Sequence, residues 1–257
     1  MAKTTFNPRD DFQVAAAIGL FEGVTGLADF AQELDLQADT PTILGTGSGD
    51  ILLPPDTGEE IEIVSSDIAN GGAEIRMEVL DVAFAPKIVT VSIPAAVGAV
   101  PVLDPETGDP MVITRINAAV NIGPRGTGEL VGDLIIRSVA TPANEYGVIT
   151  AEAQELQQAV RTIPAGYDSV ITSLTASMRK SAGADTDVSL ALYGAPVGRV
   201  FRQVFAFGLQ RSGGTNIEFV NFSLESSTGP TDLYLVAESS ASGAAVAARL
   251  TVTLINK

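Results

Sequence analysis

The sequence contains one tripeptide that is typical of aspartic proteases, formed by Asp56, Thr57 and Gly58. Such enzymes need two carboxylates about 3 Å apart that share one proton, and therefore two such motifs or a symmetric dimer. The chain has a single copy, and Glu59 and Glu60 follow where the protease motif continues with a small residue. Because Pro-Asp-x-Gly is also a favoured turn, we expect a turn that opens a strand.

Two acidic loops offer carboxylate oxygens of the kind that bind Ca²⁺: Asp104, Glu106 and Asp109 in one, Asp185 and Asp187 in the other. Neither has the spacing of a calcium-binding loop, so we expect solvated turn residues. Two carboxylates also suffice for a glycosidase, but sugar sites favour aromatic platforms, and the chain has no Trp and only four Tyr. We therefore predict no catalytic residue, no metal site and no cofactor, and hence no enzyme.

Two further patterns point to binding chemistry only weakly. The glycine-rich stretches 45–50 and 123–128 lack the Lys-Ser/Thr of a phosphate-binding loop, so they predict turns. Bases and aromatic residues interleave in 199–207, as in some nucleic-acid-binding segments. However, Phe201, Phe205 and Phe207 share one face of a strand, which favours packing in the core or between subunits.

Composition excludes several classes of function. The 257 residues include no His and no Cys, which excludes a Ser-His-Asp triad, a cysteine nucleophile, a thiolate or imidazole zinc site and disulfides. The net charge of −16 argues against a nucleic-acid partner and against binding to an anionic membrane. Residues 1–150 hold 22 acidic and 7 basic side chains, whereas 151–257 hold 9 and 8. We expect the acidic half to face solvent and the nearly neutral half to pack against other subunits.

Residues 1–40 are expected to form a short, partly helical N-terminal arm. Large apolar residues recur there at helical spacing: Phe12, Leu20, Leu27, Phe30 and Leu34. Glycines interrupt the pattern, and short helices are marginal on their own because nucleation is costly. The apolar side of the arm should therefore dock, either on the sheets of its own chain or on a partner or neighbouring subunit.

Beyond the arm the hydrophobic period changes from helical spacing to two, which predicts an all-β fold. We expect two β-sandwich or jelly-roll-like domains in tandem: an acidic β-sandwich over 41–147 and a jelly-roll-like β-sandwich over 148–257. Apolar residues switch from odd to even positions after Val79, which predicts a β-bulge with an extra residue on that strand. Residues 141–152 are interpreted as a connector.

Four stretches also carry a family resemblance: Asp11 to Leu20, Ile163 to Gly166, Thr172 to Ser177 and Val200 to Leu209. They resemble the arm and the C-terminal half of virion structural proteins of tailed bacteriophages. The chain departs from that pattern at Asp29, Phe30 and Ala31, where the family has Lys-Phe-Gly. The resemblance implies a head decoration or vertex-type subunit that is trimeric, and no catalytic residues.

The predicted function is a non-enzymatic structural subunit of a phage particle, a capsid decoration (cement) or vertex protein that assembles as a homo-oligomer. Its partners are other copies of itself, with a trimer preferred, and the major capsid or other virion proteins. It is made in the host cytoplasm and located in the virion. The predicted docking or oligomer interface consists of Phe12, Leu20, Leu27, Phe30, Leu34, Phe201, Phe205 and Phe207. The alternative is a tail or spike adhesin that binds a host surface glycan.

Overall fold

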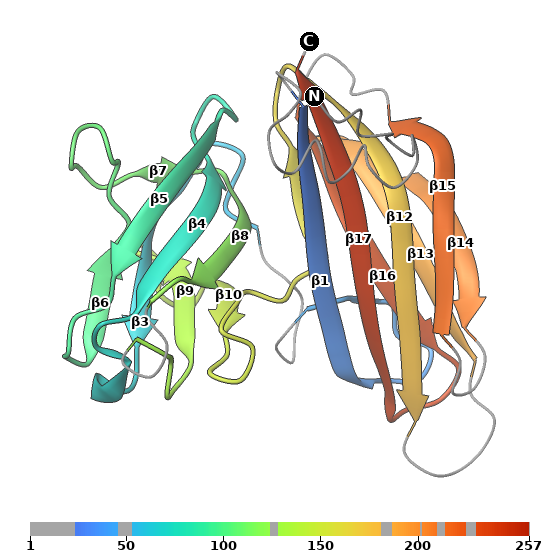
Figure 1. Cartoon of the computed structure of the whole chain (residues 1–257), viewed down its shortest axis with the longest axis horizontal. Helices are drawn as coiled ribbons and strands as arrows, with labels where there is room; N and C mark the ends of the chain where they lie inside the picture. Colours follow the sequence, from blue (N-terminus) through green and yellow to red (C-terminus); the bar gives the residue numbers. More distant parts are fainter. Residues whose placement is uncertain are drawn as a thin grey trace, which may run out of the picture.

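The computed structural model of the chain describes residues 24–45, 53–123, 128–180, 187–200, 202–209, 214–224 and 230–256. Within these residues every regular element is a strand except one short 3-10 helix, η1 (Ile68–Asn70), so the predicted all-β class is confirmed. Figure 1 shows two β bodies side by side. We call residues 53–149 the N lobe, and residues 24–45 with 159–256 the C lobe.

The C lobe has the strand order of a jelly roll. Its strands pair in nested antiparallel fashion: β1 with β17, β2 and β11 with β16, β12 with β15, and β13 with β14. These strand pairs form two sheets, β1-β17-β12-β15 and β11-β16-β13-β14, which is the double-sheet arrangement of a jelly roll (Figure 1). The bounds are β1 (Val24–Leu36), β2 (Thr42–Ile43), β11 (Val160–Ile163), β12 (Tyr167–Lys180), β13 (Val188–Pro196), β14 (Arg202–Leu209), β15 (Gly214–Leu224), β16 (Thr231–Ser239) and β17 (Ala244–Asn256).

The core of the C lobe is formed by apolar side chains at every second position of its strands. On β13, Val188, Leu190 and Leu192 are buried, and they share one hydrophobic cluster with residues of the opposite sheet such as Leu174 and Val246. Alternate side chains of a strand point to opposite faces, so each sheet contributes one apolar face to the cluster. The two sheets are therefore held together mainly by burial of aliphatic side chains.

The N lobe is a second, smaller sandwich with a hydrophobic cluster of its own that includes Ile61, Met77 and Ile136. One sheet has the order β10-β9-β3-β6, with β7 also on β3, and the other has the order β5-β4-β8. The bounds are β3 (Glu59–Ser65), β4 (Glu74–Leu80), β5 (Pro86–Ser92), β6 (Gly98–Pro101), β7 (Val112–Ile113), β8 (Arg115–Asn121), β9 (Leu134–Ser138) and β10 (Glu145–Ile149).

The helical stripe predicted over 27–34 is wrong, because these residues belong to strand β1. β1 runs antiparallel to β17 from the pair Val24 and Ile255 to the pair Leu36 and Ala244. A glycine-interrupted helix is marginal by itself, whereas pairing with a thirteen-residue strand satisfies the backbone along the whole segment. Residues 1–23 lie outside the described part of the chain, and so does the helix expected there.

The order of the lobes along the chain differs from a simple tandem. β1 and β2 belong to the sheets of the C lobe, and the N lobe follows β2 and precedes β11. The N lobe is thus inserted between two segments that pair with the same strand, β16. The domain division at residues 40 and 147 stays a prediction.

Two local expectations need correction. A bulge does lie at Val79, but the extra residue is Asn117 on the partner strand β8, because Glu78 pairs with Ala118 and Val79 with Ile116. The connector predicted over 141–152 is wrong in part, because residues 145–149 form β10, which pairs with β9. The segment that leads from the N lobe back to the C lobe is 150–158 instead.

Candidate functional site

Asp56 lies in the turn that the sequence predicts. The Gly58 N–H donates to the Pro55 carbonyl over 2.7 Å, and β3 begins one residue later. Gly58 has φ +72, and a Cβ at this position would come within 2.8 Å of Val112 Cγ1 on β7. The glycine of the tripeptide is therefore required by a left-handed turn and by close packing. The side chain of Asp56 pairs with Arg115, with 2.6 Å between Oδ1 and Nη2.

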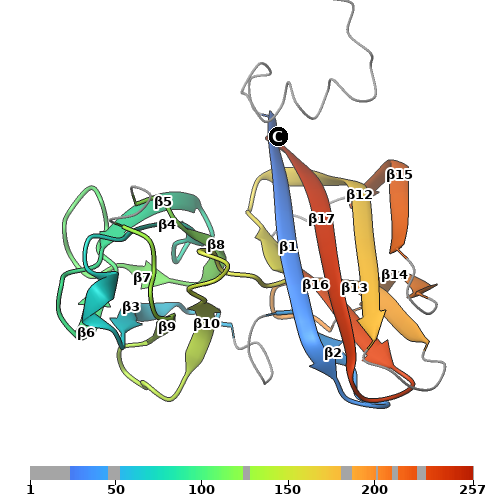
Figure 2. The ribbon, with the colours of Figure 1, turned by 60° about the horizontal axis from the view of Figure 1, so that its bottom comes forward.

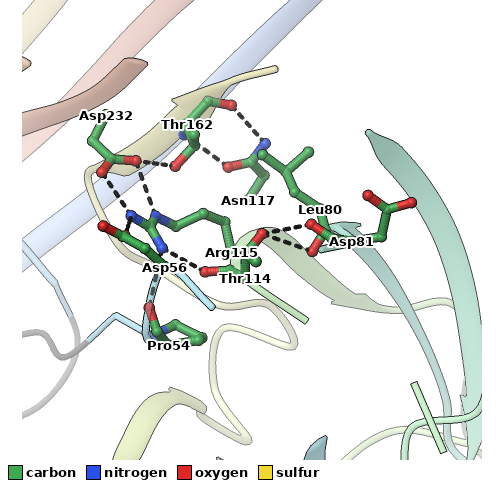
Figure 3. Close-up of polar contacts among 9 residues, drawn as sticks. All are labelled: Pro54, Asp56, Leu80, Asp81, Thr114, Arg115, Asn117, Thr162 and Asp232. Atoms are coloured by element: carbon green, nitrogen blue, oxygen red, sulfur yellow. Dashed lines mark hydrogen bonds and ion pairs between the residues drawn. The ribbon is translucent and has the colours of Figure 1, made fainter. Parts of the chain in front are cut away.

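Arg115, at the start of β8, uses all five N–H donors of its guanidinium (Figure 3). Nε and Nη2 donate to the two carboxylate oxygens of Asp232 on β16, each over 3.0 Å. Nη1 donates to the carbonyls of Pro54 and Thr114, and the second Nη2 bond goes to Asp56. Arg115 thus joins two segments of the N lobe to a strand of the C lobe.

The bulged residue Asn117 makes the second contact between the lobes. Its Nδ2 donates to the Thr162 carbonyl over 2.9 Å, and its Oδ1 accepts from the Thr162 N–H over 2.8 Å. The Thr162 hydroxyl in turn donates to Asp232 Oδ1 over 2.5 Å (Figure 3). A bulge leaves one residue outside the ladder of backbone hydrogen bonds. Here that residue is Asn117, and its side-chain amide pairs with the backbone of Thr162 on β11 as a neighbouring strand would.

Residues 150–158 join the lobes by backbone pairing as well as by sequence. The Leu156 N–H donates to the Ala119 carbonyl of β8 over 2.8 Å, and the Asn121 N–H donates to the Gln154 carbonyl over 2.8 Å. Immediately beyond, the Ala159 N–H donates to the Leu44 carbonyl over 2.8 Å, within the C lobe. The junction is therefore hydrogen-bonded on both sides, which is the behaviour of a fixed connection rather than of a free linker.

The junction buries charge in compensated pairs. The side chains of Arg115 and Asp232 are each 4% exposed, whereas that of Asp56 is 51% exposed. Burial lowers the pKa of Arg115, but its hydrogen bonds and ion pairs with Asp232 and Asp56 outweigh that effect, and the net pKa is raised. Burial also raises the pKa of Tyr234, with a further rise from the charge of Asp232. The arginine thus stays charged and the tyrosine neutral in the folded state.

The predicted docking residues do not form one surface in the described structure. Phe12, Leu20 and Phe201 lie outside the described residues. Leu27, Phe30 and Leu34 lie on β1 at an edge of the C-lobe sheet, and their role at an interface stays a prediction.

Phe205 and Phe207 lie on β14, at an edge of the opposite sheet. They pair across the strands with the buried residues Leu192 and Leu190. Both rings are partly buried against the C-lobe cluster, with centroids 5.7 Å apart. Their packing with the core is therefore direct, and an inter-subunit role for them stays a prediction.

In the acidic loop at 104–109, Asp104 and Glu106 make local contacts, whereas Asp185 of the other loop lies outside the described residues. Glu106 Oε1 pairs with Lys87 Nζ over 2.7 Å, and this hydrogen bond raises the pKa of Lys87. Asp104 Oδ1 accepts from the Glu106 N–H over 2.8 Å. Within the described part of the chain, no group of three or more potential ligands has the arrangement of a metal site. No helix there has the length and hydropathy of a membrane span.

Two features of the structure were not predicted from the sequence. The first is the buried ion pair of Arg115, although a single charged residue between Asp109 and Arg125 indicates a charge that is buried and paired.

The second is the set of exposed apolar side chains of the N lobe. Of the nine large apolar side chains exposed in the described residues, eight lie in the N lobe: Ile68, Val82, Ile88, Val97, Leu103, Ile122, Val131 and Val139.

No protein-family model and no curated protein matches the chain. Solved structures that align with it include empty particles (top component) of cowpea mosaic virus, at 11% identity over 82% of this chain and 85% of that chain, with a TM-score of 0.22. Another is the Gx strain of infectious bursal disease virus, at 14% identity over 91% and 76%, with a TM-score of 0.25. The VP2 subviral particle of infectious bursal disease virus aligns at 11% identity over 93% and 73%, with a TM-score of 0.24. These scores are too low to establish a shared fold.

Proposed function

We propose that the chain is a non-enzymatic structural subunit of a tailed-phage particle, a capsid decoration (cement) or vertex protein that works as a homo-oligomer. The observation that carries the proposal is the junction of the lobes. Hydrogen bonds of the Arg115, Asp232 and Asn117 side chains join the two lobes into one unit. A subunit that must keep its shape in an assembly needs such a fixed connection more than an exposed reactive group.

Two further observations support this proposal. The sequence resembles virion structural proteins in its arm and in its C-terminal half, including Val200 to Leu209. The C lobe has the jelly-roll order that viral capsid domains share with lectins and cupins. A jelly-roll fold serves several functions, so the fold alone does not identify one of them. The sequence resemblance to virion structural proteins is what favours a structural role. On this proposal the chain is made in the host cytoplasm, resides in the virion, and contacts its own copies and the major capsid or other virion proteins.

Native mass spectrometry of the purified chain at micromolar concentration tests the assembly part of the proposal. We expect a closed homo-oligomer, with a trimer as the preferred state. A monomer alone over the whole concentration range would contradict the proposal.

The second candidate is a tail or spike adhesin for a host surface glycan. Jelly-roll topology favours it to the extent that lectin domains share this topology. The absence of Trp and the low count of Tyr argue against strong sugar stacking. Screening the purified oligomer on an array of bacterial surface glycans separates the candidates, because saturable binding to one glycan class supports the adhesin and no binding supports the structural subunit.

A further inference from the structure

The far end of the N lobe carries an exposed apolar tip, which we define as η1, residues 94–99 and residues 128–133. Ile68, Val97 and Val131 are exposed there, each from a different one of these segments. Figure 2 shows the short helix beside β6, on the side of the N lobe turned away from the C lobe. A Cβ on Gly71, the residue after η1, would lie 2.5 Å from Ala95 Cα, and one on Gly132 would lie 3.0 Å from Asp67 Cβ, so the three segments adjoin one another. Large apolar side chains exposed on adjoining segments commonly mark an interaction site.

The tip is held in one conformation by a buried amide. Asn70 is fully buried, and its Oδ1 accepts from the N–H groups of Val131 and Gly132 over 2.9 and 3.0 Å. Its Nδ2 donates to Ser65 Oγ and to the Gly132 carbonyl, each over 3.0 Å. This arrangement ties η1 to residues 128–133 before any partner arrives and so lowers the entropy cost of binding.

The tip combines apolar and acidic groups. Exposure alternates along 128–133, so that Glu129, Val131 and Asp133 are exposed while Leu130 is buried. Val131 is 63% exposed and is flanked on both sides by an exposed acid. The N lobe as a whole holds 14 acidic and 5 basic residues. A matching partner needs an exposed apolar side chain that is flanked by bases.

The C lobe carries such a feature in the turn between β13 and β14. Val200 is 85% exposed, and Arg199 and Arg202 on either side of it are exposed as well. The turn is closed by a hydrogen bond from the Arg199 N–H to the Pro196 carbonyl over 2.9 Å. Residues 188–217 contain three arginines and no acidic residue, in a chain whose net charge is −16. The Asp56 carboxylate lies beside the turn, with Oδ2 3.8 Å from the position of a Cβ on Gly198, but it already pairs with Arg115. The exposed Arg199 and Arg202 therefore make the turn a basic counterpart of the acidic tip.

We infer that the Val131 tip of one copy docks on the Val200 turn of a second copy, with Glu129 and Asp133 facing Arg199 and Arg202. This inference rests on the proposed function, since it assigns the surface through which the subunits assemble. The tip and the turn lie on different lobes, so the contact is head-to-tail, and such contacts close into rings when the rotation permits.

Charge exchange tests the contact. The variants are Glu129→Lys, Arg202→Glu and the double variant, with Glu145→Lys and Arg76→Glu as controls at exposed N-lobe positions outside the tip. Dissociation constants are measured by mass photometry and analytical ultracentrifugation at low and high salt, after circular dichroism has shown unchanged folding.

We expect each single variant to weaken self-association about tenfold, because like charges then meet across the contact. The double variant should recover affinity to within about threefold of the unaltered chain, because the opposite charges meet again. High salt should weaken the unaltered oligomer and leave the control variants indistinguishable from it.

The outcomes separate this inference from the proposal beneath it. If the unaltered chain assembles while the single variants assemble equally well, or the double variant does not recover, the docking surface is wrong and self-assembly still holds. If the unaltered chain is monomeric throughout, the homo-oligomeric function fails, and the docking surface fails with it.

Discussion

Arg115 on β8 and Asp232 on β16 form a two-bond ion pair across the junction of the lobes, with Nε to Oδ1 and Nη2 to Oδ2 both at 3.0 Å. The same guanidinium also holds Asp56, whose side chain is about half exposed. One arginine therefore makes a buried and an exposed ion pair at once. Removing one partner of a buried pair is costly, because the other charge stays buried.

Asp232→Asn should destabilise the folded chain by about 3 kcal/mol, because Arg115 loses its buried counter-ion. Asp56→Asn is the matched control, and its cost should stay below about 1 kcal/mol, because water screens an exposed pair. Urea unfolding followed by circular dichroism gives both free energies of unfolding. Equal losses for the two variants would show that burial does not distinguish the pairs.

Alkaline pH should weaken the fold through Tyr234. Its pKa is raised in the folded chain, so above about pH 10 the unfolded chain loses the phenolic proton while the folded chain retains it. The contribution of Tyr234 to stability is therefore complete below pH 10 and declines above it. Tyr234→Phe should show a shallower alkaline decline in the free energy of unfolding. Parallel pH profiles for the two proteins would rule out this role.

Two truncations of the N-terminus should distinguish the contribution of β1 to stability from that of the residues before it. Removing residues 1–37 deletes an edge strand and the buried Leu36, so the C lobe should lose cooperative unfolding or fail to fold. Removing residues 1–23 leaves β1 intact, and the chain should still fold. Thermal unfolding monitored by calorimetry compares the two. A fully stable chain without residues 1–37 would mean that β1 does not support the C lobe.

Asn70→Ala should loosen the tip without unfolding the N lobe. The substitution leaves the N–H groups of Val131 and Gly132 without their acceptor, at a cost of about 1–3 kcal/mol. Hydrogen exchange measured by NMR should show faster exchange for these two amides and unchanged protection on β4. Protection that persists at Val131 and Gly132 would contradict the role of Asn70 as the anchor of the tip.

The sequence predicts the all-β class because side-chain period is a local property. Strand β3 shows this directly, since Ile61 and Ile63 are buried and Glu60 is exposed, as the alternation requires. β1 misled the prediction because its apolar residues fit two periods. Leu27, Phe30 and Leu34 fit a helical stripe, but Phe30, Leu34 and Leu36 also occupy even positions, as one face of a strand requires, and only the distant strand β17 decides between the two.

The candidate site was less predictable, because it joins residues far apart in the chain. The turn at Asp56 follows from local preferences, but its partner Arg115 and the link to Asp232 depend on the packing of two lobes. Net charge predicts the acidity of the N lobe and says nothing of its apolar tip, because exposure depends on which loops Asn70 brings together. The expectation that the acidic half faces solvent stays a prediction.

The most direct test of the structural role is a cryo-EM reconstruction of virus particles purified from a culture that produces the chain. We expect ordered density on the particle that fits copies of the two-lobed subunit in a closed ring, most simply a trimer, with each N-lobe tip against a neighbouring C lobe. The contradicting result is a particle at full resolution with no such density and no peptide of the chain detected by mass spectrometry.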